Sequence, residues 1–211
     1  MDLDPVEIRV LGCLIEKQKT TPDAYPLSLN ALRLACNQST NRDPVVEYDE
    51  ETIRGALHRL GRRGWTRLAS GAGSRAAKYR HLLDEKPGLS AGEQALLAVL
   101  MLRGPQTPGE VRSRSERMHR FADDAALEDT LERLIDREFV ARLGRRPGQK
   151  EERFAHRLGE DLEDAPAPAP APAPAQAPAP RAGDRVGELE RRVEALEREV
   201  AELRQAARGG T

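Results

Sequence analysis

The sequence predicts a mainly α-helical protein with small β-hairpins, and two observations carry this prediction. Apolar residues make up 38% of the 211 residues but aromatic residues only 3%, so any core must be built from aliphatic side chains. Small helical domains manage this more easily than a large β-sandwich. Apolar residues also recur at helical spacing in the N-terminal part, and the pattern returns further along the chain. Length and repetition together indicate two small domains followed by a tail.

Capping signals place the first two helices. Asp4-Pro5-Val6-Glu7 combines a capping aspartate, a proline suited to the first helical position and a glutamate that can close a capping box. It predicts a helix that ends near Lys17, before two prolines that break it. A second helix is predicted over Ser28 to Asn37, with four buried positions: Leu29, Leu32, Leu34 and Ala35. A polar loop, residues 38–49, follows it.

The third helix and the segment after it are the most basic part of the chain. Residues 52–81 hold eight Arg or Lys and no Asp or Glu, although the whole chain has a formal charge of −1. Strands are predicted near 65–69 and 76–81, on either side of a glycine-rich turn. A helix followed by a basic hairpin is typical of a winged helix, in which Trp65 would anchor the hairpin against the core. The helix, Glu50 to Arg63, has one apolar face: Ile53, Ala56, Leu57 and Leu60.

The next part of the chain repeats this pattern. Ser90-Ala91-Gly92-Glu93 is another capping box, 86 positions after the first, and residues 126–138 match the third helix at an offset of 74. The first copy is therefore 12 residues longer, and the polar loop is the predicted place for the extra residues. A second hairpin is predicted from strands near 139–143 and 153–158. These features predict two tandem winged-helix domains, residues 1–86 and 87–163.

The tail differs from both domains in composition. Residues 165–180 are an almost strict alternation of Ala and Pro, within a predicted linker at 164–183. Such a segment is an extended spacer with a reach of up to roughly 50 Å. A coiled-coil helix is predicted at 184–207 from its heptad seam: Val186, Leu189, Val193, Leu196, Val200 and Leu203. Val at a and Leu at d favour a parallel homodimer, and the flanking charges are attractive in that arrangement. A different coiled-coil partner and an exposed single helix are the alternatives.

The predicted function is DNA binding by the first domain, with transcriptional regulation as a candidate role. Winged helices commonly lay the third helix in the major groove while the hairpin holds phosphates. The exposed stripe of the third helix is basic, whereas the matching stripe of the second copy, Glu128, Glu132 and Asp136, would be repelled by phosphate. The predicted contacts are therefore all in the first domain: Arg54, His58, Arg59, Arg62, Arg63, Arg67, Arg75, Lys78 and Arg80.

Two alternatives to DNA binding stay open. The basic stretch is also explained as solvated surface. The tandem domains could equally form a protein-interaction scaffold with no nucleic-acid role, in which Arg54 and Arg62 of one chain dock on Glu128 and Glu132 of another. The second domain keeps basic residues that could assist on phosphate or pair with its own acidic stripe: Arg112, Arg114, Arg117, Arg120, Arg145, Arg146 and Lys150.

The residues indicate neither an enzyme nor a bound cofactor. The four histidines are scattered, and none has metal-ligand spacing, a paired nucleophile or a glycine-rich phosphate loop beside it. Cys13 and Cys36 lack disulfide or zinc spacing and are expected to be buried free thiols. The acidic N-terminus is not a signal peptide, and the longest apolar run, 95–102, is shorter than the ~20 residues that span a bilayer. We expect a cytoplasmic protein without metal, membrane or small-molecule ligand.

Several segments of the chain form one recognisable set: Gly12 to Gln18, Thr20 to Pro22, Tyr25 to Ser28, Ala35 to Gln38, Asn41-Arg42 and Leu102 to Arg114. In this order they resemble the YceH family of bacterial proteins. The resemblance covers about Leu3 to Leu158 and leaves out the linker and the coiled coil, which we expect to be an addition found in some members. It implies a tandem winged-helix fold. Because the family has no established biochemical role, the resemblance transfers no catalytic or binding residue.

Overall fold

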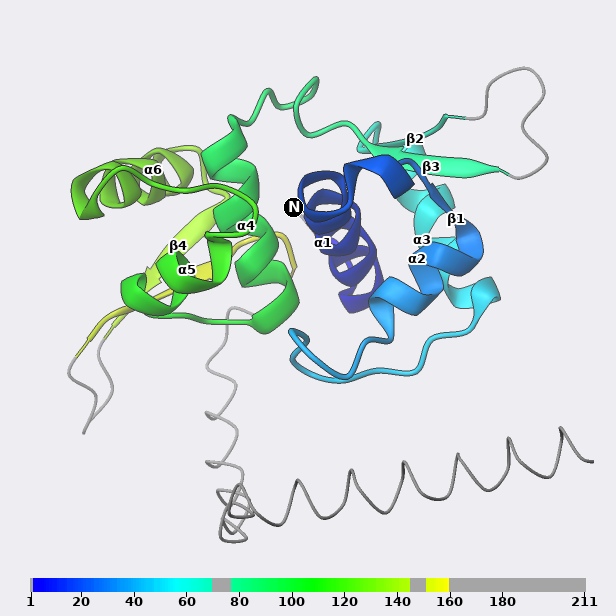
Figure 1. The fold of residues 1–211 in the computed structure, drawn as a ribbon, viewed down its shortest axis with the longest axis horizontal. Helices are drawn as coiled ribbons and strands as arrows, with labels where there is room; N and C mark the ends of the chain where they lie inside the picture. The colour runs from blue at the N-terminus through cyan, green and yellow to red at the C-terminus, as the bar shows by residue number, and fades with distance from the viewer. Residues whose placement is uncertain (1, 70–76, 145–150, 160–211) are drawn as a thin grey trace, which may run out of the picture. The chain divides into compact units, whose positions relative to one another are not determined.

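Helices make up most of the structure, a computed structural model that describes residues 2–69, 77–144 and 151–159. These residues form six α-helices, a short 3-10 helix and two small antiparallel sheets (Figure 1). All of them belong to one unit, Met1–Glu163. The predicted mainly helical fold with small hairpins is confirmed for this part of the chain. The domain boundary at 86/87 stays a prediction, and we call the described residues before and after it the first and second half.

The elements of the two halves follow the same order. In the first half they are α1 (Pro5–Thr20), a 3-10 helix (Pro22–Ala24), β1 (Leu27–Ser28), α2 (Leu29–Cys36), α3 (Glu50–Arg62), β2 (Thr66–Leu68) and β3 (Lys78–His81). In the second half they are α4 (Ala91–Arg103), α5 (Pro108–Ser115), α6 (Asp124–Asp136), β4 (Val140–Leu143) and β5 (Arg153–His156). Three helices and then an antiparallel strand pair thus occur twice.

Both predicted capping boxes are present. The Asp4 carboxylate accepts a hydrogen bond from the Glu7 backbone N–H at 2.8 Å, and the Glu7 carboxylate accepts one from the Asp4 N–H at 2.9 Å. Ser90 and Glu93 repeat the arrangement at the start of α4. These bonds satisfy backbone N–H groups that a helix start leaves free. α1 continues to Thr20, beyond its predicted end near Lys17.

The first sheet has one strand that the sequence did not reveal. Its order is β1-β3-β2, with Leu27 opposite Tyr79 and Thr66 opposite His81. β1 has only two residues, too few for a visible alternation of apolar and polar side chains. In the second sheet Val140 lies opposite His156. The predicted strand pairs are confirmed, and both predicted turns extend into segments outside the described residues.

The prediction that the polar loop holds all the extra residues of the first half is wrong, because they are divided among three places. α1 has 16 residues and α4 has 13. The connection from α1 to α2, Thr21–Ser28, is four residues longer than its counterpart, Gly104–Thr107. The connection from α2 to α3, Asn37–Asp49, is five residues longer than Glu116–Asp123. Sequence offsets fix only the total length difference, so they could not divide it among the connections.

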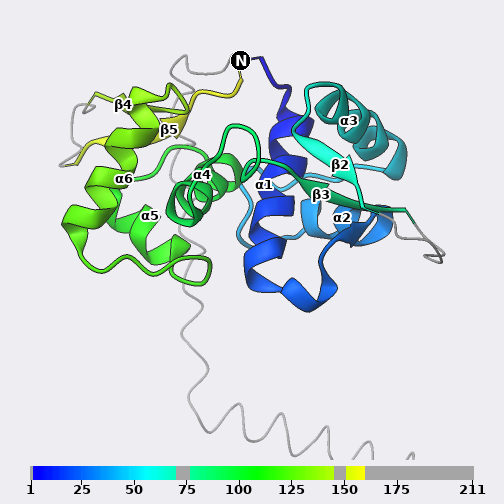
Figure 2. The ribbon, with the colours of Figure 1, turned by 90° about the horizontal axis from the view of Figure 1, so that it is seen from above.

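A single apolar cluster runs through both halves. α1 packs against α4, and the two helices lie side by side in both views (Figures 1 and 2). Gly12 permits this approach, because a Cβ atom at that position would lie 3.0 Å from Leu102 Cδ2 and 3.2 Å from Met101 Cβ. Trp65 is partly buried against the cluster, as predicted. Cys13 and Cys36 are buried free thiols, also as predicted.

The predicted burial of Leu34 is wrong. Its side chain is 56% exposed, whereas Leu32 and Ala35 are buried and Leu29 is partly buried. Successive residues of a helix are about 100° apart, so Leu34 points away from the face that carries Leu32. Within the described residues, no helix combines the length and apolar character needed to cross a membrane.

Candidate nucleic-acid interface

The helix α3 carries the predicted basic stripe on its outer face. Asp49 caps the helix by accepting a hydrogen bond from the Thr52 N–H at 2.8 Å, and hydrogen bonding to Thr52 holds the pKa of Asp49 below its usual value. The four predicted core positions of α3 are buried. Burying that face leaves Arg54, His58 and Arg62 exposed on the other. None of the three has a hydrogen-bond or ion-pair partner among the described residues.

Arg59 and Arg63, in contrast, hold α3 against the start of α1. The Nε atoms of Arg59 and Arg63 lie 3.5 Å and 3.9 Å from Glu7 Oε1. Arg59 also pairs with the capping residue Asp4, and Arg63 donates to the Asp2 backbone carbonyl at 2.8 Å. The Glu7 carboxylate is buried, and a buried carboxylate needs a compensating charge. Both arginines therefore have a structural role that the sequence prediction did not include.

The second half also has an arginine that pairs with a buried glutamate near the start of its first helix. Arg137, which matches Arg63 at the offset of 74, lies 3.1 Å from Oε1 of the buried Glu93. It also donates to the Pro87 carbonyl at 2.7 Å, shortly before the start of α4. Because the second half has the arginine without the basic stripe, the shared task of Arg63 and Arg137 is to bridge two helices.

The basic residues of the hairpin are partly neutralised. Arg67 lies 3.9 Å from Glu85 Oε1, and Arg80 pairs with the same carboxylate. Glu85 lies four positions after residues 52–81, the stretch that contains no Asp or Glu. The folded chain therefore places a carboxylate beside basic side chains that have no acidic neighbour within that stretch. Lys78 is partly buried on β3, and Arg75 lies outside the described residues. The exposed side chains of α3 are therefore the strongest part of the predicted interface.

The matching helix α6 is acidic on its outer face. Glu128, Glu132 and Asp136 are all exposed. Glu132 pairs with Arg142 of β4, whereas the carboxylates of Glu128 and Asp136 have no ion-pair partner in the part of the chain that the structure describes. α3 and α6 lie on opposite sides of the α1–α4 pair (Figure 2). The structure thus keeps the basic and acidic stripes apart.

Two buried arginines were not predicted from the sequence. The Arg9 guanidinium donates to the carbonyls of Cys36 at 3.2 Å and Pro44 at 2.6 Å. Arg42, also buried, donates to the Ala35 carbonyl at 3.0 Å and pairs with Glu16 at 2.6 Å. Together they fasten the polar loop to α1 and α2. Arginine is rarely buried, so composition alone gives no signal for such a role.

The remaining predicted features have these outcomes. The dimerisation seam, Val186 to Leu203, lies outside the described residues, as do Arg145, Arg146 and Lys150. Arg112 pairs with Asp124 and Arg120 with Glu116, so these basic residues bond to neighbouring acids rather than to the acidic stripe. The described residues contain no group of three or more His, Cys, Asp or Glu side chains that could hold a metal ion.

Comparison with known proteins identifies the family. The family model described as "Protein of unknown function, DUF480" matches residues 3–149. A relative from Pelobacter propionicus, described as "UPF0502 protein", is 49% identical over 207 residues, which cover 97% of this chain and 94% of the relative. That alignment extends beyond the DUF480 region, so the relative shares the tail as well as the two halves. The chain therefore belongs to the DUF480 family.

Proposed function

We propose that each half is a winged helix and that the first half binds DNA through α3 and the β2–β3 hairpin. One observation carries the proposal: the outer face of α3 presents Arg54, His58 and Arg62 with no partner among the described residues. Arginine side chains contact guanine edges in the major groove and also neutralise phosphates. Arg59 differs from these residues, because the contact of α3 with the start of α1 provides it with Asp4 and Glu7 as partners.

The predicted DNA contacts fall into two groups. Arg54 and Arg62 have no partner in the part of the chain that the structure describes, so we assign them the largest share of DNA affinity. Arg59 and Arg63 hold α3 in its orientation through their bonds to Glu7 and Asp2. We expect them to contribute to DNA binding only while those bonds are kept. The hairpin arginines share Glu85, so their net contribution to phosphate binding is reduced.

Fluorescence anisotropy with random duplex DNA tests the proposal. We expect the Arg54→Glu, Arg62→Glu variant to bind at least about tenfold more weakly for each arginine replaced. The slope of log affinity against log salt should also fall by about 2. Arg120→Glu with Arg133→Glu is the matched control, because it makes the same charge change on the second half. No affinity at low salt, or equal losses in both variants, would contradict the proposal.

We also propose that the tail makes the protein a parallel homodimer, which would present two basic stripes to one duplex and so raise the effective affinity. The heptad seam supports this proposal. Light scattering on a chain lacking 186–203 should give about half the mass of the full chain. An unchanged mass would show that residues outside the seam hold the dimer together.

The second candidate is a scaffold in which α3 of one chain docks on α6 of another. The exposed Glu128 and Asp136 favour it, since their charges complement Arg54 and Arg62 and they have no ion-pair partner among the described residues. A charge swap in the chain that lacks residues 186–203 separates the two candidates, because the proposed tail dimer would otherwise keep the variants associated. If Arg54→Glu with Arg62→Glu abolishes self-association and adding Glu128→Arg with Asp136→Arg restores it, the scaffold is correct and DNA binding is not needed.

A further inference from the structure

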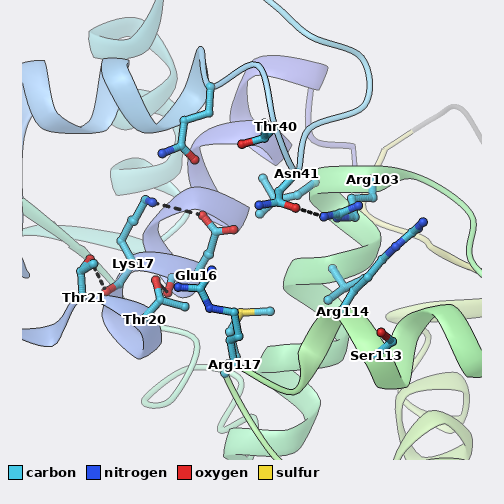
Figure 3. A pocket seen from close by; sticks show the side chains of 14 residues that line it. Glu16, Lys17, Thr20, Thr21, Thr40, Asn41, Arg103, Ser113, Arg114 and Arg117 are labelled. Atoms are coloured by element: carbon cyan, nitrogen blue, oxygen red, sulfur yellow. Dashed lines mark hydrogen bonds and ion pairs between the residues drawn. The ribbon is translucent and has the colours of Figure 1, made fainter. Parts of the chain in front are cut away.

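A cavity of about 440 Å³ lies between the two halves. The last turn of α1 and the polar loop form one wall, and the C-terminal ends of α4 and α5 form the other (Figure 3). No residue of α3 or of either hairpin lines it within the described part of the chain. Its volume falls in the usual range of small-molecule sites, roughly 300–1,000 Å³.

Positive charge dominates the walls. Four cationic side chains line the cavity, and Glu16 is the one carboxylate among the described residues that line it. Glu16 is already neutralised, because Arg42 lies 2.6 Å and Lys17 3.6 Å from its Oε2. Arg114 is 3.4 Å from Glu110, which does not line the cavity. Once Lys17 is set against Glu16, three arginines of the second half remain on the walls, of which Arg114 is already paired with Glu110: Arg103, Arg114 and Arg117.

Helix ends explain only part of this cluster. Basic residues are common in the last turn of a helix, where they offset its dipole, and Arg103 and Arg114 fit that pattern. Arg117 lies beyond the end of α5 and has no side-chain partner among the described residues. Burial lowers the pKa of Arg103, and the nearby charge of Arg114 lowers it further. Because Arg103 and Arg114 repel one another, an anion placed between these two side chains would be stabilised.

The wall on the first half includes residues from segments that the second half lacks. Thr20 lies past the point where the matching helix α4 ends, and Asn41 belongs to the longer polar loop. That loop is fixed to α4, because the Asp43 N–H donates to the Leu102 carbonyl at 2.8 Å and Asn41 accepts from Arg103. The extra residues of the first half therefore form part of the cavity wall that faces the second half.

We propose that this cavity binds a small molecule that carries a phosphate group. The guanidinium groups of Arg103, Arg114 and Arg117 supply planar, paired donors that match phosphate oxygens. The hydroxyls of Thr40 and Ser113 add neutral donors, and Met118 offers an apolar contact for the organic part. The site is separate from the α3 stripe, so it stands independently of the proposed DNA binding. Its walls come from distant segments, which is why the sequence indicated no small-molecule ligand.

Titration calorimetry of the full chain with inorganic phosphate and with pyrophosphate, at constant ionic strength, tests the proposal. We expect saturable binding that Arg114→Gln with Arg117→Gln weakens at least about tenfold. Arg112→Gln with Arg120→Gln is the matched control, because it removes two charges from the same segment outside the cavity. Thermal unfolding confirms that each variant is folded. No saturable binding up to about 10 mM pyrophosphate, or equal weakening by both variants, overturns the proposal.

DNA binding by the same variants separates this site from the proposed interface. We expect Arg114→Gln with Arg117→Gln to leave duplex affinity unchanged within about twofold, since α3 is intact. If the variant instead loses as much DNA affinity as Arg54→Glu with Arg62→Glu, the cations belong to a nucleic-acid surface and the small-molecule site is wrong. Pyrophosphate binding that persists in a chain without DNA affinity would support the cavity alone.

Discussion

The helices α3 and α6 have the same length and the same buried positions but opposite charges outside. Each has 13 residues. Ile53, Leu57 and Leu60 of α3 correspond to Leu127, Leu131 and Leu134 of α6, and all six are buried. The inner face is fixed by packing, whereas the outer face is free to differ, so a shared scaffold does not imply a shared partner. The exposed faces carry Arg54, His58 and Arg62 in one helix and Glu128, Glu132 and Asp136 in the other.

The comparison also separates structural arginines from available ones. Arg63 and Arg137 match in position, and each bonds a buried glutamate and the backbone before the first helix of its half. Arg54 and Arg62 match acidic residues instead. A basic residue that occurs in both halves is thus explained by the fold, whereas Arg54 and Arg62, which have no basic counterpart in α6, are the residues on which the proposed DNA binding rests.

The largest expected effect on stability concerns His81, which occupies the same position in its strand pair as His156 does in the second half. His81 lies opposite Thr66 and His156 opposite Val140, and each accepts a hydrogen bond at Nδ1 from the N–H two residues later. His81 is fully buried and its Nε2 lies 2.8 Å from Gln18 Oε1. Burial lowers the pKa of His81 to about 4 despite the opposing charge of Asp84.

Acid should therefore destabilise the first half through His81. Between pH 6.5 and 4 the unfolded chain binds more protons at this residue than the native state does. The free energy of unfolding should fall by about 2–3 kcal/mol as the pH is lowered across this window, with no further change from this residue above it. Urea unfolding at several pH values measures the slope. His81→Gln should remove this component and His156→Gln should retain it; equal slopes in wild type and His81→Gln would refute the assignment.

The packing of α1 on α4 should tolerate no larger side chain at Gly12. Gly12→Val places atoms where Leu102 and Met101 already lie, and such overpacking costs about 1–3 kcal/mol. Gly55→Val is the control in α3, where an added Cβ would meet only the flexible end of Arg59 at 3.3 Å. Chemical denaturation compares the two. Similar losses of stability in both variants would mean that helix propensity, not packing between the halves, sets the effect.

The smallest expected loss of stability concerns the arginines that pair with the buried glutamates Glu7 and Glu93. Arg137→Met leaves Glu93 without its cation and should cost about 1–2 kcal/mol, reduced from the fully buried case because the arginine is partly exposed. Arg63→Met should cost less, since Arg59 still lies 3.5 Å from Glu7. Urea unfolding of the double variant Arg59→Met, Arg63→Met should show a loss as large as that of Arg137→Met. A larger loss for Arg63→Met alone would contradict this redundancy.

Much of the fold could be predicted from patterns among residues that are close together in the sequence. Capping residues located the starts of α1 and α4, apolar spacing identified the buried face of α3, and the two offsets revealed the repetition of the halves. These features depend on residues a few positions apart, which the sequence displays directly. The opposite charges of α3 and α6 were visible for the same reason.

The sequence by itself thus determined the helices, the hairpins, the duplicated order and the basic stripe of α3. Only the tertiary structure decided which arginines of that stretch are occupied, because their partners Glu7 and Glu85 lie outside the basic window. It also decided that β1 joins the sheet and that Arg42 is buried. Finally, it brought Arg103 and Arg117 to one cavity with the end of α1. Each of these outcomes depends on contacts between distant segments, which no local pattern of residues encodes.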